Sequence, residues 1–476
     1  MTEKRPPIVV IMGHVDHGKT TLLDYIRKTN VVTREAGGIT QSIGAYEIEH
    51  GGKKVTFIDT PGHEAFSKMR AHGALAADLA ILVVGADDGV KPQTKEALKF
   101  IKEAKIPFIV AINKIDKQNA DIEKAKQDLA QNEIFLEGYG GNVSWQAISA
   151  KTGEGINELL DLVILATELE NLTYTKNQEG AGFILSSRRD SKRGVLAVGV
   201  LKNGALGINQ LIATETAKGK IKILEDFAGK NVKHLEPSAP ALILGFENLP
   251  QIGEEFLSGP NALKIHKTKN EIKDLKINKG DEKENQNTIN LILKTYEVGS
   301  LAALKNIIAK IGLELPLKIV QASVGDIYEN DIKFAISTNS IIIGFKVKID
   351  KAASNLSKAQ KITIMNSEII YELEKELKEY GEKLTLKEAR AMEILAVFGE
   401  AKGIERVVGG RVLIGPIKNQ ETFEVWRGQK RIGEGKILNL QSQRKDVAEA
   451  ETDTEAGLLV ESQESIKVKD RLVFAN

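Results

Sequence analysis

One eight-residue segment near the start of the chain constrains its fold more than any other feature. The segment Gly13 to Thr20 reads GHVDHGKT and fits the pattern G-x-x-x-x-G-K-[ST]. It follows an apolar run, Ile8 to Met12, and precedes a helical run, Thr21 to Lys28. In this position the pattern is typical of a loop whose backbone N–H groups surround a phosphate, and a plain glycine-rich turn is disfavoured. We therefore expect a P-loop between a buried strand and a helix.

The side chains at the end of this loop have the chemistry that a bound nucleoside triphosphate requires. Lys19 is expected to bridge β- and γ-phosphate oxygens, and the Thr20 hydroxyl is expected to ligate Mg²⁺. In this segment and directly after it, the residues that we expect to contact the nucleotide are Gly13, Val15, Asp16, His17, Gly18, Lys19, Thr20 and Thr21.

A second motif, Asp59-Thr60-Pro61-Gly62, follows the strand-like run Val55 to Ile58. Asp59 is expected at a strand end, where its carboxylate reaches the magnesium shell through water, and the Gly62 N–H is expected to donate to the γ-phosphate. Loss of that phosphate would free the segment after Gly62. D-x-x-G alone is often a simple turn, but its position after the domain's second apolar run favours the phosphate role.

Two further loops indicate which base is bound. In Asn113-Lys114-Ile115-Asp116, the Asp116 carboxylate can accept hydrogen bonds from N1–H and the exocyclic amine of guanine, and adenine lacks this donor pair. Asn113 can tie this loop to the P-loop, and the stem of Lys114 can cover the ring. In Ser149-Ala150-Lys151, the Ala150 N–H is expected to donate to guanine O6. The predicted cofactors are therefore GTP or GDP with Mg²⁺.

The rest of the chain changes pattern several times, which predicts a multidomain α/β and β protein. Between residue 8 and about residue 170, continuously apolar runs alternate with helical patterns, as in a doubly wound α/β fold. Short alternating segments with turn signals then predict barrels. We expect a P-loop GTPase domain at 1–172, a β-barrel at 173–260, a charged linker at 261–287, a three-layer α/β domain at 288–360, a linker helix at 361–384 and a second β-barrel at 385–476.

Composition narrows the functional classes. A chain of 476 residues is too long for one ordinary core. Because 66 Lys and Arg balance 65 Asp and Glu, net charge does not indicate nucleic-acid binding, and any RNA contact requires local patches. The absence of cysteine excludes disulfides and thiolate metal sites. Without a secretory signal or an apolar run of about 18 residues, we expect a cytoplasmic, monomeric protein with no membrane partner.

The P-loop taken together with Asp59 to His63 resembles the translational GTPase family. The resemblance implies that His63 orients the attacking water, a role that Gln has in Ras. It further implies that Val15 and Ile39 form an apolar gate that keeps His63 away until the ribosome repositions it. Considered alone, His63 would more often be a surface or helix-capping residue.

The segment Arg34 to Gln41, REAGGITQ, resembles the first switch loop of bacterial-type translation initiation factor two, and Thr40 would then ligate Mg²⁺ in the GTP state. The likeness continues in Glu236 to Pro240 and in Val324 to Phe345. It implies a factor that binds the small ribosomal subunit, recognises formylmethionyl initiator tRNA through its last barrel, promotes joining of the large subunit, and leaves after GTP hydrolysis.

Two departures from that family pattern affect these expectations. The chain has no long extension before the first domain, so contacts made by such an extension would be absent or supplied otherwise. In the last barrel, Gln441 and Ser442 stand where the family has Lys and Arg, and Ala456 and Gly410 stand where it has Cys. Losing two cations and two thiols changes the attraction for the tRNA acceptor end and the shape of the amino-acid pocket. The sequence leaves open whether formylation is read.

Other observations keep alternatives open. Arg188, Arg189, Lys192 and Arg193 crowd one predicted hairpin, which is either a solvated turn or a contact for ribosomal RNA. Two other functions remain possible for the chain as a whole: an elongation-type aminoacyl-tRNA carrier, and a non-catalytic GTP-gated ribosome-binding protein.

Overall fold

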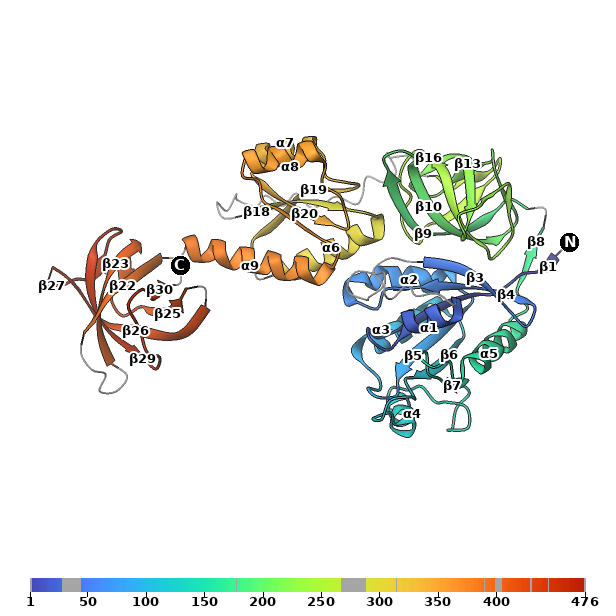
Figure 1. Ribbon diagram of the computed structural model, residues 1–476, viewed down its shortest axis with the longest axis horizontal. Coiled ribbons are helices and arrows are strands. Elements are labelled where there is room, and N and C mark those ends of the chain that lie inside the picture. Colours follow the sequence, from blue (N-terminus) through green and yellow to red (C-terminus); the bar gives the residue numbers. More distant parts are fainter. Residues whose placement is uncertain are drawn as a thin grey trace. The chain divides into compact units, whose positions relative to one another are not determined.

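The computed structural model describes residues 2–27, 44–176, 178–266, 288–313, 315–388, 390–398, 405–428, 430–443 and 445–474, with no side chains described at 382–388. It divides into two compact units, Met1–Glu374 and Lys375–Asn476. The first unit holds three domains and the second holds one barrel together with most of the helix that precedes it (Figure 1).

The first domain is a six-stranded sheet with helices on its faces (Figure 1). The order is β3-β4-β2-β5-β6-β7, and only β3 is antiparallel to its neighbour. The strands are β3 (Gly44–His50), β4 (Lys53–Asp59), β2 (Ile8–Gly13), β5 (Leu79–Gly85), β6 (Phe108–Asn113) and β7 (Trp145–Ala147). The helices are α1 (Lys19–Arg27), α2 (Ser67–Ala76), α3 (Pro92–Ala104), α4 (Ile122–Gln131) and α5 (Ile156–Leu169).

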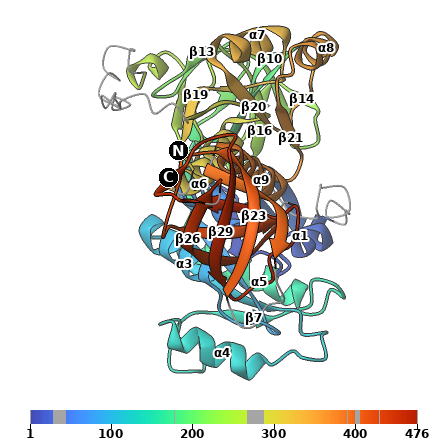
Figure 2. The ribbon, with the colours of Figure 1, turned by 90° about the vertical axis from the view of Figure 1, so that its left-hand side faces the viewer.

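The central strands β2 and β5 explain why this sheet is mainly parallel. Every residue of both strands is buried, because helices cover the two faces, and this matches their continuously apolar sequences. Both views show α4 beyond the β7 edge of the sheet (Figures 1 and 2). A two-stranded ladder of β1 (Thr2–Lys4) and β8 (Thr173–Thr175) joins the start of the domain to its exit.

A closed β-barrel follows. Its sheet order is β12-β17-β9-β10-β16-β13-β14, and pairing of β12 with β13 closes the ring. The strands are β9 (Ala181–Asp190), β10 (Gly194–Asn203), β12 (Leu211–Ala213), β13 (Lys218–Asp226), β14 (Asn231–Val232), β16 (Pro240–Phe246) and β17 (Glu255–Ser258), with the small pair β11 (Leu206–Gly207) and β15 (His234–Leu235) and a short 3-10 helix, η3 (Ala262–Lys264).

The third domain has four parallel strands in the order β19-β18-β20-β21, with helices on both sides (Figure 1). The elements are β18 (Ile289–Thr295), α6 (Val298–Ile311), β19 (Leu317–Val324), α7 (Glu329–Thr338), β20 (Ser340–Phe345), α8 (Lys351–Ala359) and β21 (Ile364–Ser367). The three-layer α/β arrangement predicted from the sequence is present.

One predicted boundary is wrong here. The linker helix expected at 361–384 begins only at Ile370, where α9 (Ile370–Glu388) starts, and residues before it form β21. The reason is pairing at the sheet edge: Ile364 and Met365 lie beside Ile342 and Ile343 of β20, and Met365 is buried. Helical spacing of apolar residues therefore held for α9 but not for the four residues that complete the sheet.

The second unit contains another closed barrel, whose curved strands face the viewer in Figure 2. Its order is β25-β30-β22-β23-β29-β26-β27, closed by β25 with β26. The strands are β22 (Arg390–Phe398), β23 (Glu405–Ile414), β24 (Ile417–Lys418), β25 (Thr422–Arg427), β26 (Lys430–Ser442), β27 (Lys445–Asp446), β28 (Glu449–Ala450), β29 (Glu455–Ser462) and β30 (Arg471–Phe474). In chain order these strands connect as those of the first barrel do, so the two barrels share one topology.

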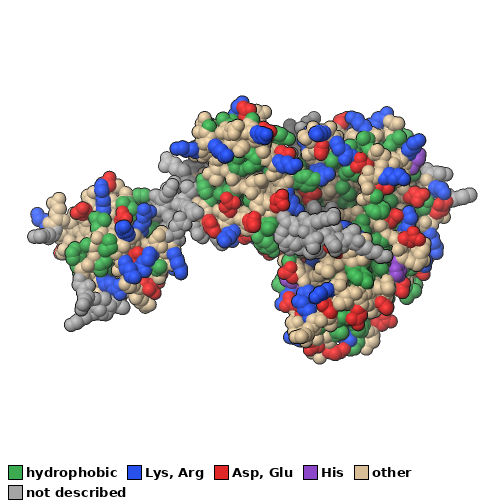
Figure 3. All heavy atoms as spheres, viewed as in Figure 1, with side chains coloured by type: hydrophobic (Ala, Val, Ile, Leu, Met, Phe, Trp, Pro, Cys, Tyr) green, Lys and Arg blue, Asp and Glu red, His purple; other side chains and the backbone are tan. Residues whose placement is uncertain are grey.

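Surface charge agrees with the balanced composition. On the face of the first unit shown in Figure 3, basic and acidic side chains are interspersed. Within the described ranges, no helix combines the length and the apolar character needed to cross a membrane.

Candidate functional site

The P-loop lies between β2 and α1, and its backbone requires glycine at both ends. Gly13 has φ of +144° and Gly18 has φ of +86°. A Cβ atom would lie 2.4 Å from the Val83 carbonyl oxygen at Gly13 and 2.4 Å from the Asn113 Nδ2 atom at Gly18. The loop is thus packed between the β5 strand end and the Asn113 loop, and no side chain fits at either glycine.

Lys19 lies inside this loop rather than in solvent. Its side chain is only 6% exposed, and Nζ donates to the His14 carbonyl oxygen at 2.5 Å. Burial lowers the pKa of Lys19 to about 8, and the nearby Asp59 carboxylate opposes this lowering. A buried ammonium of this kind is stabilised by an anion, and phosphate oxygens would supply one.

The second motif packs directly on the P-loop. Asp59 ends β4, and Thr60 Oγ1 donates to the Ile11 carbonyl oxygen at 2.8 Å. A Cβ atom at Gly62 would lie 2.6 Å from Lys19 Nζ and 3.2 Å from the Val15 backbone nitrogen. A side chain at position 62 would therefore displace Lys19 Nζ from its present position, and glycine lets this loop approach Lys19 closely.

The donor chemistry near Asp59 suits a magnesium ion. Asp59 of β4 pairs with Ile11 of β2, and Ile11 precedes the start of the P-loop by two residues. Thr20 is the second residue of α1. A carboxylate and a hydroxyl oxygen beside a phosphate site are the few hard ligands that Mg²⁺ takes from proteins, with water and phosphate completing its shell. The third expected ligand, Thr40, lies outside the described residues, as does Ile39 of the expected gate.

The base-selecting loops are joined by one buried amide. The Asn113 side chain is 1% exposed, and its Nδ2 donates to the His17 carbonyl oxygen at 2.8 Å, which is the tie to the P-loop that the sequence predicted. Asp116 is exposed at the end of the same loop, and its Oδ1 accepts from Ser149 Oγ at 2.7 Å. This hydrogen bond lowers the pKa of Asp116, so the residue is a carboxylate with acceptor capacity left for a base.

The structure differs from expectation at two backbone donors. The Ala150 N–H, expected to face guanine O6, donates to Asn113 Oδ1 at 2.9 Å. The Val15 N–H, expected to face a phosphate, donates to Gln93 Oε1 at 2.9 Å. In both cases a side-chain oxygen from another element, Gln93 of α3 or Asn113 at the end of β6, lies next to the amide, so either donor must exchange its partner before it can bind a nucleotide.

Five other residues that were predicted to contact the nucleotide differ in how accessible their side chains are. The His17 side chain is fully buried beneath the loop, and burial lowers its pKa to about 4, so only its backbone can face a nucleotide. Lys114 has φ of +69°, and its Nζ lies 3.2 Å from Asp87 Oδ2. Lys151, Asp16 and Thr21 are exposed.

His63 follows the second motif directly, and it is 3% exposed. It caps the short 3-10 helix η2 (Glu64–Phe66), and its Nδ1 accepts from the Ala65 N–H at 2.9 Å. Since Nδ1 accepts, the neutral ring carries its proton on Nε2, and Nε2 is buried without a hydrogen-bond partner among the described residues. Burial lowers the pKa of His63, so the ring is neutral at pH 7. The helix-capping position that a lone histidine would favour is therefore the one that His63 occupies.

Sequence reasoning missed the residues that bind the backbone of the segment from Pro61 to His63. Arg70 of α2 is fully buried and donates to the carbonyl oxygens of Pro61 at 2.9 Å and His63 at 2.5 Å, and it pairs with Glu96 of α3. Nothing in the local sequence of α2 marks this arginine, because its partners come from other elements.

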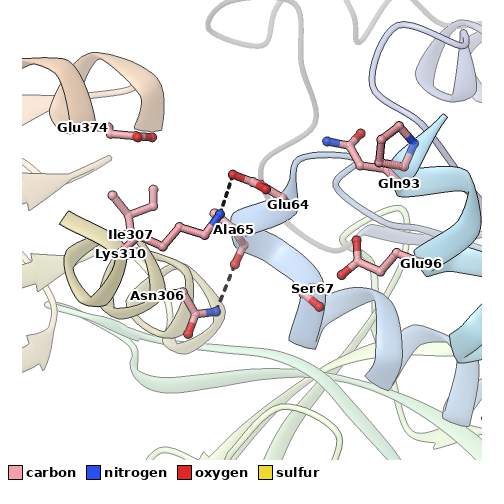
Figure 4. Close-up of a pocket in the computed structure, with 10 residues that line it drawn as sticks. Glu64, Ala65, Ser67, Gln93, Glu96, Asn306, Ile307, Lys310 and Glu374 are labelled. Carbon is pink, nitrogen blue, oxygen red and sulfur yellow. Dashed lines mark hydrogen bonds and ion pairs between the residues drawn. The ribbon is translucent and has the colours of Figure 1, made fainter. Parts of the chain in front are cut away.

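The third domain contacts the same segment. Lys310 Nζ lies 2.7 Å from Glu64 Oε1, and Asn306 Nδ2 lies 3.4 Å from the Ala65 carbonyl oxygen (Figure 4). These residues line a cavity of about 440 Å³ between η2, α3 and α6. The loop after Gly62 thus has one side on the P-loop and another on α6.

At the basic hairpin, for which the sequence left a solvated turn and an RNA contact open, two of the four cations have partners within the protein. At the β9–β10 turn, Arg193 pairs with Glu225 and Arg188 lies 4.7 Å above the Tyr296 ring, while Arg189 and Lys192 are exposed.

In the second barrel, Gly410 pairs with Ala456 across two strands, and a Cβ atom at Gly410 would lie 2.3 Å from the Glu393 carbonyl oxygen, which leaves no room for a thiol. On the neighbouring strand, Gln441 Nε2 donates to Asp446 Oδ1 at 2.8 Å, and Ser442 Oγ lies 3.4 Å from the Glu455 carbonyl oxygen.

Comparison with known proteins identifies relatives along the whole chain. Family models match residues 4–168 (Elongation factor Tu GTP binding domain), 179–259 (Elongation factor G domain 2) and 262–378 (Translation-initiation factor 2). Translation initiation factor IF-2 of Thermotoga sp. (strain RQ2) is 40% identical over 493 residues, which cover 99% of this chain and 71% of the relative. The IF-2 of Onion yellows phytoplasma is 40% identical, covering 98% and 79%. Among solved structures, GDP-bound aIF5B from Aeropyrum pernix matches 99% of this chain and 92% of its own, with 25% identity and a TM-score of 0.46.

Proposed function

The chain belongs to the translation initiation factor IF-2 family and is a translation initiation GTPase, and on that premise we propose that the ribosome stimulates its GTP hydrolysis through His63. The observation that carries the proposal is the position of His63, directly after the loop that packs on Lys19, with a buried Nε2 that has no partner among the described residues. The identity across the whole chain does not favour an elongation-type carrier or a non-catalytic ribosome-binding protein.

We propose that the nucleotide is held by the P-loop, by Gly62 and by the two base loops. Lys19 would contact β- and γ-phosphate oxygens, and the Gly62 N–H would donate to the γ-phosphate. Asp116 would select guanine. Mg²⁺ would be held by Thr20, by Asp59 through water, and by Thr40 in the GTP state, and it would neutralise charge on the phosphates.

The present state of His63 supports a mechanism in which the ring must move before it acts. Its Nδ1 accepts from Ala65, so only a donor, Nε2–H, is left for other partners. To orient an attacking water, the ring has to leave this contact and come within about 3 Å of that water. Val15, whose Cγ2 lies 3.2 Å from where a Gly62 Cβ would be, would form one half of the apolar gate.

Contacts of the loop after Gly62 support a route from hydrolysis to the third domain. The bonds of Lys310 to Glu64 and of Asn306 to Ala65 join α6 to η2 (Figure 4). When the γ-phosphate leaves, Gly62 loses its hydrogen bond to that phosphate, and a shift of η2 would change the contacts that η2 makes with α6. This is a physical reason for the factor to release its partners after hydrolysis.

For partners, we propose the small and large ribosomal subunits, ribosomal RNA and formylmethionyl initiator tRNA, the last bound by the barrel of residues 390–474. The exposed Arg189 and Lys192 support an RNA contact at the β9–β10 turn. Gln441 and Ser442 are uncharged where the family has cations, and the Gln441 amide is occupied by Asp446, so the tRNA contact is expected to be weaker than in cation-bearing relatives.

Single-turnover GTP hydrolysis with and without ribosomes tests the role of His63. His63→Ala should bind GTP normally and lose most of the ribosome-stimulated rate, whereas the matched control His50→Ala, on β3 of the same domain, should hydrolyse as the wild type does. A normal stimulated rate in His63→Ala would exclude the proposed role. Light scattering of subunit joining with GTP, GDP and a non-hydrolysable analogue then tests the assignment of the partners.

A further inference from the structure

One aromatic contact around His63 comes from an element that the GTPase mechanism does not use. Tyr371, in the first turn of α9, has its ring centroid 4.0 Å from that of His63, with the planes inclined at 58°. Phe66 of η2 lies 6.0 Å away in an edge-on arrangement. The imidazole is therefore held between its own short helix and the beginning of α9.

The two contacting rings differ in exposure, with His63 buried and Tyr371 partly exposed. His63 is 3% exposed, while Tyr371 is 46% exposed and its ring contacts the imidazole. No hydrogen bond joins the His63 ring to Tyr371, because the only hydrogen bond of the imidazole ring among the described residues is the one with Ala65. Removal of the Tyr371 ring would thus break no hydrogen bond to His63.

We propose that Tyr371 is a positioning residue that holds the His63 imidazole in its withdrawn orientation, so that hydrolysis requires Tyr371 and His63 to separate. The inference rests on the proposed role of His63. It assigns to the beginning of α9 a control over the timing of hydrolysis.

The charges around the pair agree with this assignment. Glu64 and Glu374 favour protonation of His63, Arg70 and Lys310 disfavour it, and the larger effect of burial keeps its pKa low. The Tyr371 phenol, whose own pKa is raised by burial, is near enough to Asp16 of the P-loop to feel its charge. Tyr371 therefore contacts His63 and lies within electrostatic range of the P-loop.

The test is single-turnover GTP hydrolysis by the full-length protein without ribosomes. Tyr371→Ala should hydrolyse about fivefold faster than the wild type, which corresponds to about 1 kcal/mol, because the withdrawn state loses an aromatic contact. Tyr371→Phe keeps the ring and should restore the wild-type rate. Tyr380→Ala, nine residues further along α9, controls for weakening of the helix and should not change the rate. With ribosomes, the wild type and Tyr371→Ala should converge.

A second measurement follows His63 directly. In histidine-labelled protein, NMR titration should give a higher pKa for His63 in Tyr371→Ala than in the wild type or in Tyr371→Phe, because water reaches the ring. If Tyr371→Ala does not fold, Tyr371→Leu retains apolar bulk without an aromatic face and should show the same direction with a smaller rise in rate.

The outcomes separate this inference from the proposed function. An unchanged or slower rate in Tyr371→Ala, or a Tyr371→Phe variant as fast as Tyr371→Ala, overturns the positioning role. If His63→Ala hydrolyses normally on ribosomes, the proposed function itself fails. If His63→Ala is inactive while Tyr371→Ala matches the wild type in rate and His63 pKa, only the role of Tyr371 is lost.

Discussion

Replacement of Lys19 by Met should stabilise the nucleotide-free protein while abolishing nucleotide affinity. Burial lowers the pKa of Lys19 from 10.5 to about 8. At 1.36 kcal/mol per tenfold change in proton affinity, keeping this ammonium charged at pH 7 costs about 3 kcal/mol. Met fills similar space but leaves the His14 carbonyl without its donor, which costs about 1 kcal/mol. The net expected gain is about 2 kcal/mol.

The sign of the pH dependence gives a sharper test. Between about pH 8 and pH 10.5 the unfolded chain holds a proton at Lys19 that the folded protein has released, so wild-type stability should rise with pH in this window. Lys19→Met should lack that part of the rise. Bound GTP or GDP should raise the pKa of Lys19, and nucleotide affinity should fall as the pH passes about 8.

The chain provides a selective probe for this measurement. It has two tryptophans, Trp145 in the first domain and Trp426 in the second barrel, so a Trp426→Phe background leaves Trp145 to report unfolding of the P-loop domain. Urea unfolding at several pH values would compare the wild type, Lys19→Met and the control Lys95→Met, an exposed lysine on α3. If Lys19→Met is no more stable than Lys95→Met at pH 7 and keeps the full rise above pH 8, the reasoning is refuted.

Four further predictions follow from other contacts. Asp116→Asn should exchange guanine preference for xanthine preference in nucleotide binding, because a carboxamide donates where the carboxylate accepts, and unchanged GTP affinity would remove this residue from the base site. Arg70→Met should destabilise the first domain by about 2 kcal/mol in urea unfolding, since the Pro61 and His63 carbonyls lose their donor. His17, whose pKa falls from 6.5 to about 4, should make stability fall as the pH drops from 6.5 towards 4, by up to about 3 kcal/mol, and His17→Gln should lack this fall. Gln441→Lys with Ser442→Arg should tighten initiator tRNA binding and steepen its dependence on salt in filter binding, and a tRNA affinity equal to that of the wild type would exclude this strand from the tRNA contact.

The parts of the fold that could be predicted are those whose evidence is local. The run Ile8 to Met12 and the glycines after it specify a strand and a tight loop within a dozen residues, and β2 and the P-loop lie there. β21 could not be predicted in the same way. Ile364 and Met365 become a strand only because β20 offers an open edge to pair with, and that edge is formed by residues about 20 positions earlier.

The site shows the same division between local and distant information. The motif residues around the P-loop are recognisable from spacing, but the residues that restrain them are not. Gln93 reaches Val15 over a separation of 78 positions, and Asn306 reaches Ala65 over 241. Tyr371 carries no motif at all. Such partners are set by how whole elements pack, which one sequence does not encode in any short window.

The contiguity of each domain has a consequence for how the chain is made. The second barrel closes its ring using only strands between Arg390 and Phe474, and each earlier domain likewise completes its sheet from one uninterrupted stretch. A nascent polypeptide can therefore finish one core before the next has been synthesised, and no domain waits for a distant segment to arrive. A factor that serves protein synthesis is thus itself suited to folding stepwise while it is being translated.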